Sequence, residues 1–220
     1  MRTRKPTEAE VGNVMAYRNR HDCWGIVIIA GCDSETRFTM WSCKSSGSTN
    51  DSLAWNFSQF KQELEKGKLP IKWYVVGDEA FTNTQQFLVP WAGRGLKADK
   101  DSFNYHLSAM RQCIERAFGI LTQRWGIFWR PVRCAFDKWT LLSRTCAKLH
   151  NYCLDQNEVK PSYRLLKDMR RKDSPTVLLN GNNYGGDRRS SSGNSTRDNL
   201  TAYFNTSGII RPAHANTRKL

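Results

Sequence analysis

The 220-residue chain is long enough for one domain and a further segment, and 39% hydrophobic and 11% aromatic residues are typical of a protein with a sizeable core. The formal net charge of +14 favours nucleic acid or an anionic membrane surface as a partner, with a merely soluble basic protein as the alternative. No segment has the length and apolarity of a membrane-spanning helix, and the basic start lacks the apolar stretch of a secretory signal. The seven cysteines are spread singly, which favours reduced thiols in an intracellular protein.

The first part of the chain predicts a lead-in, a hairpin and a helix. Residues 1–20 are polar and charged, so we expect them to be poorly ordered. The run WGIVIIAG (24–31) is apolar and β-branched, as in a buried strand, and RFTMWSC (37–43) alternates roughly like an antiparallel partner. After a polar loop, in which Ser48, Thr49, Asn50 or Asp51 would cap, residues 52–67 have apolar side chains at helical spacing.

The remainder predicts one more strand and two long helices. IKWYVVG (71–77) is a short apolar run, and residues 103–128 and 137–158 show helical periodicity. Beyond about residue 170 the composition shifts to Ser, Asn, Gly and Arg, which predicts a flexible basic tail over residues 171–220. Strands and helices in this order indicate an α/β protein that begins with an antiparallel hairpin.

Two acidic residues stand where a metal site would form. Asp78 follows a strand, and ligands in open α/β sheets gather at the carboxyl ends of strands. Glu115 adjoins Ile114 of an apolar helix stripe, so we expect its side chain to point along the seam between helix and sheet. Carboxylates are the ligands that Mg²⁺ and Mn²⁺ prefer. Two such cations close together can bind the attacking and the leaving oxygen when a phosphodiester is hydrolysed. The alternatives are a plain turn residue at Asp78 and an ion pair between Glu115 and Arg111.

Five phrases occur in a fixed order along the chain: GSTNDS, YVVGDEAF, LVPWAG, FNYHLSAMRQCIERAFGIL and CAKLHNYCL. Together they closely resemble the DDE-superfamily endonuclease domain of Harbinger-type (PIF/Harbinger) transposases and nucleases derived from them, from about Trp24 to Leu154. The most specific phrase surrounds Glu115. The resemblance implies a ribonuclease-H-like mixed sheet flanked by helices, which holds divalent metal, Mg²⁺ or Mn²⁺, with an Asp-Asp-Glu set.

The resemblance also implies roles for individual residues. Asp78 matches the family's second catalytic aspartate and Glu115 its catalytic glutamate, so both are expected to act as catalytic metal ligands. Asp51 matches a recurrent aspartate that holds metal, positions its loop or caps the next helix.

The chain departs from the family at its first catalytic aspartate. A phrase resembling IDGTH is expected on an opening strand, but residues 1–20 contain no aspartate, and Asp22 and Asp33 are badly placed. We therefore expect a domain without its first core strand, whether through truncation of the gene model, decay or co-option. The predicted organisation is a disordered or truncated lead-in at 1–20, a partial nuclease-like domain at 21–160 and the tail at 171–220.

Two other clusters have competing interpretations. Cys146, His150 and Cys153 share one helix face, but an apolar packing role is favoured over metal because no fourth ligand is evident. In RWGIFWRPVR, Arg124, Arg130 and Arg133 alternate with aromatic residues. This pattern predicts either a nucleic-acid contact or a solvated rim around core aromatics, with neither favoured.

Two functions follow from the residues and the resemblance. The first is metal-dependent hydrolysis of DNA phosphodiesters, impaired by the missing aspartate. The second is an inactive co-opted or decayed fragment that binds DNA or protein. The resemblance implies DNA and a Myb-like DNA-binding protein as partners, no membrane, and a location in the nucleus, with the cytoplasm second.

Overall fold

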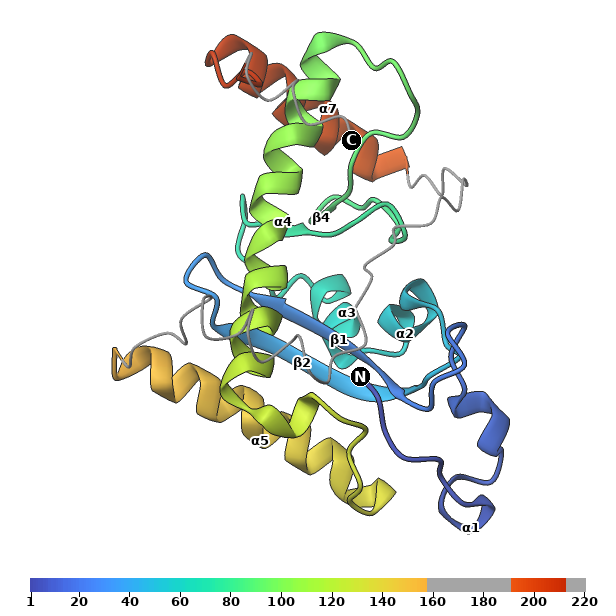
Figure 1. The fold of residues 1–220 in the computed structure, drawn as a ribbon. Coiled ribbons are helices and arrows are strands. Elements are labelled where there is room, and N and C mark those ends of the chain that lie inside the picture. Colours follow the sequence, from blue (N-terminus) through green and yellow to red (C-terminus); the bar gives the residue numbers. More distant parts are fainter. Residues whose placement is uncertain (158–190, 213–220) are drawn as a thin grey trace. The chain divides into compact units, whose positions relative to one another are not determined.

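The computed structural model describes residues 1–157 and 191–212. The chain divides into two compact units, one formed by Met1–Lys61 with Cys113–Asn182 and the other by Gln62–Gln112 with Asn183–Leu220. Helix α4 (Ala98–Arg124; Figure 1) begins in the second unit and ends in the first. Each unit has its own core.

The first unit is built on an antiparallel hairpin of β1 (Ile26–Cys32) and β2 (Phe38–Ser46), which confirms the predicted pair of strands. In the turn between them, the Asp33 carboxylate accepts a hydrogen bond from the Arg37 backbone N–H at 2.9 Å. Asp33 is therefore engaged in closing the turn.

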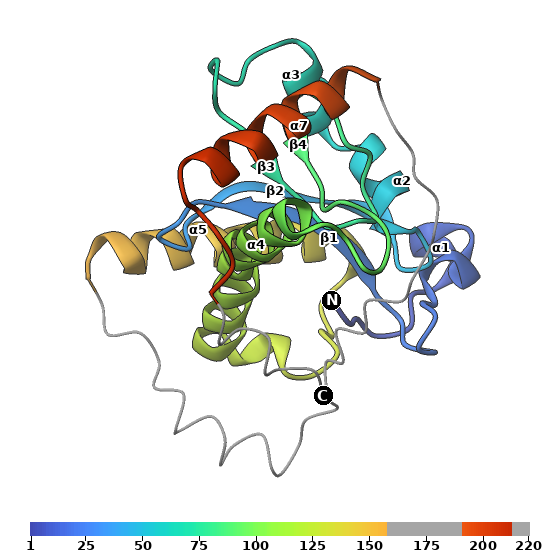
Figure 2. The same cartoon turned by 90° about the horizontal axis from the view of Figure 1, so that it is seen from above.

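The C-terminal part of α4 and helix α5 (Phe136–Asp155) pack against this hairpin (Figures 1 and 2). One buried cluster combines the three elements and consists of Phe38, Ala117, Leu121, Cys146 and Ala147. A second cluster joins the hairpin to the start of α5 and consists of Ile26, Cys43, Val132 and Trp139. Both predicted long helices are thus present, and their apolar faces bury the hairpin.

Two polar side chains of α5 fix it to the first residue of β2 and to the turn before that strand. The Asn151 side chain accepts a hydrogen bond from the Phe38 backbone N–H at 2.8 Å and donates one to the Phe38 carbonyl at 2.9 Å. His150 is fully buried, and its Nε2 lies 2.9 Å from the carbonyl oxygen of Thr36. These contacts satisfy backbone groups that the strand edge would otherwise present to solvent.

Residues 1–20, expected to be poorly ordered, contain helix α1 (Glu8–Val11) and the 3-10 helix η1 (Val14–Tyr17). A capping box between Thr7 and Glu10 begins α1. Arg4 forms an ion pair with Glu10, and this hydrogen-bonded contact lowers the pKa of the glutamate to about 2. Local polar contacts of this kind order the segment without an apolar run, which accounts for the difference from the prediction.

The single helix predicted over residues 52–67 is two helices, α2 (Asp51–Asn56) and α3 (Gln59–Glu65). Ser58 separates them, and its buried hydroxyl accepts a hydrogen bond from the Lys61 backbone N–H at 3.2 Å. Serine side chains compete in this way for backbone groups, so the residue starts a new helix rather than continuing the old one.

The second unit contains a short parallel pair, β3 (Val75–Val76) and β4 (Phe87–Leu88). The strand predicted over residues 71–77 is therefore present in its second half. The first half is exposed, with Ile71 and Trp73 at 89% and 64% of their full accessibility.

Helix α7 (Ser191–Thr206) lies in the segment that was expected to be a flexible tail. Its Leu200 and Phe204 pack against buried Leu88, Phe103 and Leu107. The composition did not predict this helix, because its contact face needs only two large apolar side chains, four residues apart. Residues 171–190 and 213–220 of the expected tail lie outside the described part of the chain.

Trp91, between β4 and α4, contacts α7 within the second unit. The Arg197 guanidinium lies over its ring, 3.8 Å from the centroid, and the Lys100 ammonium lies 3.9 Å from the same centroid. The Trp91 indole N–H donates to the Thr201 hydroxyl at 3.0 Å. Asn104 of α4 holds the Trp91 backbone by two hydrogen bonds, of 2.7 and 2.9 Å.

The described residues therefore form a mixed α/β structure, as expected, with two two-stranded sheets. A ribonuclease-H-like sheet without its first core strand remains a prediction. No helix within residues 1–157 and 191–212 is long and apolar enough to cross a membrane.

Replacing Asn151 with alanine is expected to lower the free energy of unfolding by about 2 kcal/mol, because both Phe38 backbone groups lose their partner. Urea unfolding followed by tryptophan fluorescence measures this change. The matched control is Asn56→Ala at an exposed position of α2, with an expected change within about 0.5 kcal/mol. Equal effects of the two substitutions would contradict the role of Asn151.

Candidate acidic site

Asp78 follows β3 and is separated from it by Gly77. The Gly77 N–H donates to the Leu88 carbonyl at 2.9 Å, which extends the pairing with β4 by one residue. A Cβ atom at position 77 would lie 2.4 Å from Cε1 of Phe87, so the position requires glycine. The close approach of this glycine to an aromatic ring sets where the chain leaves the strand and where Asp78 begins.

The Asp78 carboxylate is oriented by a local turn. Its Oδ1 accepts a hydrogen bond from the Ala80 backbone N–H at 3.0 Å, and its carbonyl accepts one from the Phe81 N–H at 3.3 Å. The residue is half-buried. An aspartate that hydrogen-bonds its own backbone two residues onward is a common turn feature. The turn interpretation and a ligand role are compatible here, because a carboxylate has two oxygens and several acceptor positions.

Glu115 lies in α4, on the part of the helix that belongs to the first unit. Its side chain is exposed, whereas Ile114 and Ala117 on either side of it pack into the core. The glutamate was expected along the seam between helix and sheet. The structure places it instead on the solvent side of the helix, where a charged carboxylate has no burial cost.

Asp51 is the first residue of α2, and its neighbour Asn50 caps the helix. The Asn50 side chain accepts a hydrogen bond from the Leu53 N–H at 2.7 Å. The cap is thus Asn50, one of four candidates predicted from the loop. Asp51 adds a negative charge to the first turn, where the helix dipole favours it.

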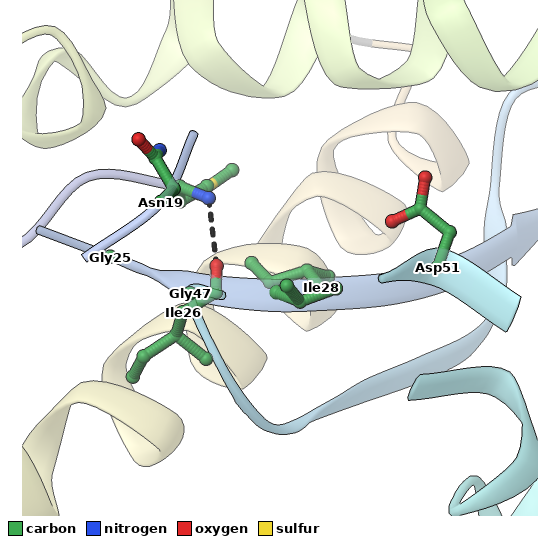
Figure 3. Close-up of a pocket in the computed structure, with 8 residues that line it drawn as sticks. Asn19, Gly25, Ile26, Ile28, Gly47 and Asp51 are labelled. Carbon is green, nitrogen blue, oxygen red and sulfur yellow. Dashed lines mark hydrogen bonds between the residues drawn. The ribbon is translucent and has the colours of Figure 1, made fainter. Parts of the chain in front are cut away.

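Asp51 also lines a pocket of about 230 Å³ in the first unit, together with Asn19, Gly47 and residues 25–28 of the hairpin (Figure 3). Gly47 is required there, because a Cβ atom would lie 2.6 Å from the carbonyl oxygens of both Gly25 and Tyr17. The Met1 amino group lies in the same pocket, donates to the Ile26 carbonyl at 2.9 Å, and has its pKa lowered by burial.

The three acidic candidates are divided between the two compact units. Asp51 and Glu115 belong to the first unit and Asp78 to the second. Among residues 1–157 and 191–212, no three His, Cys, Asp or Glu side chains are grouped so as to hold a metal ion. The convergence of Asp78 and Glu115 on one metal stays a prediction.

In RWGIFWRPVR, the aromatic side chains and the arginines lie in different surroundings. Trp125 and Phe128 pack against the buried clusters of the first unit, and the Trp129 indole N–H donates to the Thr122 carbonyl at 2.6 Å. Arg124 is half-buried at the end of α4, whereas Arg130 and Arg133 are exposed in the connection to α5. These aromatics are engaged in packing, so a nucleic-acid contact here would rest on the arginines.

Cys146, His150 and Cys153 are buried on the face of α5 that packs against the hairpin. The His150 ring lies 5.0 Å from the Phe38 ring, in addition to its contact with the Thr36 carbonyl. These contacts support the packing interpretation of the three residues.

Sequence reasoning missed several residues that shape the site. Asn19 and Gly47 line the pocket beside Asp51, and Gly77 positions Asp78. Signals were present at the glycines, because an isolated glycine beside a strand often marks a close backbone approach. Asn19 has no such signal in its flanking sequence.

The sequence profile of the family described as DDE superfamily endonuclease matches residues 1–151. The chain belongs to this family, which generally uses divalent metals and acts on DNA. The match begins at residue 1, earlier than the resemblance recognised from about Trp24 onward. No curated protein and no solved structure matches the chain.

Substitution of Gly77 by alanine is expected to lower the free energy of unfolding by about 1–3 kcal/mol, because the new methyl group meets the Phe87 ring. The matched control is Gly119→Ala in α4, where a Cβ atom meets nothing within 4 Å. That change is expected to stabilise the protein by about 0.5–1 kcal/mol, since alanine favours the helix. Chemical unfolding of both variants gives the two signs, and the same sign in both would contradict the close approach at Gly77.

Proposed function

We propose that the chain is a transposase-derived nuclease domain of Harbinger type, in which Asp78 and Glu115 are ligands of a divalent cation and Asp51 contributes less. The observation that supports this proposal most is the Asp78 carboxylate, half-buried and oriented by its turn at the carboxyl end of β3. A fixed oxygen donor at a strand end, within the part of the chain that matches a nuclease family, is suited to a hard cation such as Mg²⁺ or Mn²⁺.

The reaction is hydrolysis of a DNA phosphodiester. Water adds its oxygen to phosphorus, the bond from phosphorus to the leaving deoxyribose oxygen breaks, and that oxygen takes up a proton released by the attacking water. A cation held by Asp78 and Glu115 would supply stabilisation of the negative charge that builds up on the phosphate oxygens. The cation would also offset the negative charges of the two carboxylates. Without it, these charges would repel the phosphate.

The activity of this 220-residue chain by itself is proposed to be impaired. Residues 1–20 contain no aspartate to match the first of the family's three ligands. Two carboxylates bind a divalent cation more weakly than three, because each ligand contributes charge and coordination. The chain is proposed to act with a Myb-like DNA-binding protein in the nucleus.

A second candidate function, binding of DNA without cleavage, is favoured by the net charge of +14. Phosphate contacts from arginine and lysine give sequence-independent affinity. In the first unit, exposed Arg130 and Arg133 are the predicted contact residues. This function needs no complete set of metal ligands.

Metal binding tests the first proposal. The wild-type chain is expected to bind Mn²⁺ weakly in isothermal titration calorimetry, and Asp78→Asn and Glu115→Gln each to weaken this binding by about tenfold or more through loss of one charged ligand. The matched control for the first variant is Glu79→Gln, a neighbouring exposed carboxylate, which should leave the affinity unchanged.

DNA cleavage assays separate an impaired enzyme from an active one. No nicking of supercoiled plasmid is expected with Mg²⁺ or Mn²⁺. Robust cleavage that Asp78→Ala or Glu115→Ala abolishes would refute the impairment while supporting the ligand roles. Metal binding that is unchanged in Asp78→Asn and in Glu115→Gln would refute those roles.

DNA affinity tests the second candidate. Replacing Arg130 and Arg133 together by glutamine is expected to weaken binding to duplexes of any sequence and to reduce the slope of log K against log salt by about 2. The control removes the same charge in the second unit, with Arg94→Gln and Lys97→Gln, both exposed. Fluorescence anisotropy at several salt concentrations measures both slopes, and equal losses would assign the affinity to net charge alone.

A further inference from the structure

A turn at residues 70–73 of the second unit exposes large apolar and aromatic side chains. Ile71 and Trp73 retain 89% and 64% of their full accessibility, and Tyr74 directly after them is also exposed. The turn lies shortly before β3 and is closed by a hydrogen bond of 3.1 Å from the Trp73 N–H to the Pro70 carbonyl. Large apolar side chains that are exposed together, rather than singly, mark an interaction surface.

Lys72, the third residue of this turn, has a strained backbone. Its φ is 68°, in the left-handed region that glycine and asparagine adopt far more readily than lysine does. Residues with such strain persist where the surrounding structure fixes them, and they occur most often at functional sites. A lysine at a position suited to glycine therefore indicates a role for its side chain.

Gln86, next to β4, holds both ends of the segment that contains the turn. Its side-chain amide donates to the Leu69 carbonyl at 3.1 Å, and its own carbonyl accepts a hydrogen bond from the Val75 N–H at 2.8 Å. The exposed tip between these two contacts is therefore anchored on both sides in the unbound protein. Such preorganisation lowers the entropic cost of binding a ligand.

The charge around the turn is positive. Residues 66–74 contain no acidic residue and three exposed lysines, Lys66, Lys68 and Lys72. Glu63 of α3 pairs with the first two of these lysines. Lys72 forms no ion pair with any residue in the part of the chain that the structure describes. Its ammonium is therefore available to an anionic ligand, such as a phosphate oxygen.

An exposed indole beside lysines matches the chemistry of a nucleotide. The flat ring stacks on a base, and the ammonium groups bind the phosphates of the same strand. A base inside a duplex has both faces covered by neighbouring bases, so only an unpaired base offers a free face to Trp73. An anionic lipid surface would attract the same lysines, but the match of this chain to an endonuclease family favours DNA.

We propose that Trp73 and Lys72 form a binding site for an unpaired nucleotide of a DNA strand. The Trp73 ring stacks on the base, and the Lys72 ammonium contacts an adjacent phosphate. Trp73 precedes Asp78 by five residues, so their Cα atoms are at most about 18 Å apart, the length of about five nucleotides in a duplex strand. The site therefore binds opened DNA close to the candidate metal ligand. The inference rests on the proposed function for the identity of its ligand.

Fluorescence anisotropy of labelled oligothymidylate with the full chain, in EDTA, tests the stacking contact without any divalent cation. Trp73→Ala is expected to weaken single-strand binding by about tenfold, because one base loses its stacking partner. Affinity for a blunt-ended duplex should stay the same. The matched control is Tyr203→Ala on α7, an aromatic residue of 58% exposure in the same unit with no lysine or arginine within three positions, which should change neither affinity.

The salt dependence of the same binding separates charge from stacking. Lys72→Asn removes the charge but keeps the turn, because asparagine tolerates the left-handed backbone. In this variant the slope of log K against log salt is expected to fall by about 0.7 for a single strand, whereas Trp73→Ala should leave the slope unchanged. Lys97→Gln, at another exposed lysine of the second unit, is the control and should also leave the slope unchanged.

Trp73→Phe keeps a smaller ring at this position and should give an intermediate affinity, so it tests the contact even where the alanine variant fails to fold. Single-strand affinity that is unchanged in Trp73→Ala, or that falls equally for duplex DNA or in Tyr203→Ala, would overturn the inference. A wild type that binds no single strand, including one that uses Trp73 to bind anionic vesicles, would also overturn it. Mn²⁺ binding that still depends on Asp78 and Glu115 in these cases would leave the proposed metal site standing, which separates the two failures.

Discussion

A two-stranded hairpin is at best marginally stable in water, so the first unit depends on the helices that bury the apolar side chains of β1 and β2. Phe38 lies where the hairpin packs against both α4 and α5. Its ring packs with Leu121 of α4 and Cys146 of α5, while its backbone N–H and carbonyl are both held by Asn151. Strand, helices and hydrogen-bonded edge thus meet at one residue, and the pocket beside Asp51 is built on the same hairpin.

The elements with strong periodicity were predictable from the sequence. The hairpin and the two long helices are present because their apolar spacing matches the surfaces that they bury. The short elements were not predictable, since Ser58 divides a helix through one side-chain hydrogen bond. Helix α7 was not predictable either, because its contact face consists of two apolar residues and an arginine over Trp91.

The candidate site was predictable in part. Asp78 lies after a strand, as the order of elements indicated, and Asn50 caps the helix beside Asp51. The exposure of Glu115 was not predictable, because one position in a helical pattern turns a side chain by about 100° and separates a seam from a solvent face. Isolated glycines beside strands signalled a close approach at Gly77 and Gly47, but the local pattern does not identify the atoms that approach them, which belong to other parts of the chain.

The position of Trp91 has a practical consequence for choosing fragments of the chain. The family match ends at residue 151, yet Arg197 and Thr201 lie beyond it and hold this tryptophan from α7. A fragment that ends at residue 151 would expose Leu88 and Phe103 and present an aggregation-prone apolar surface. Expression of a soluble core domain therefore calls for a boundary after α7, even though family comparison alone would place it some fifty residues earlier.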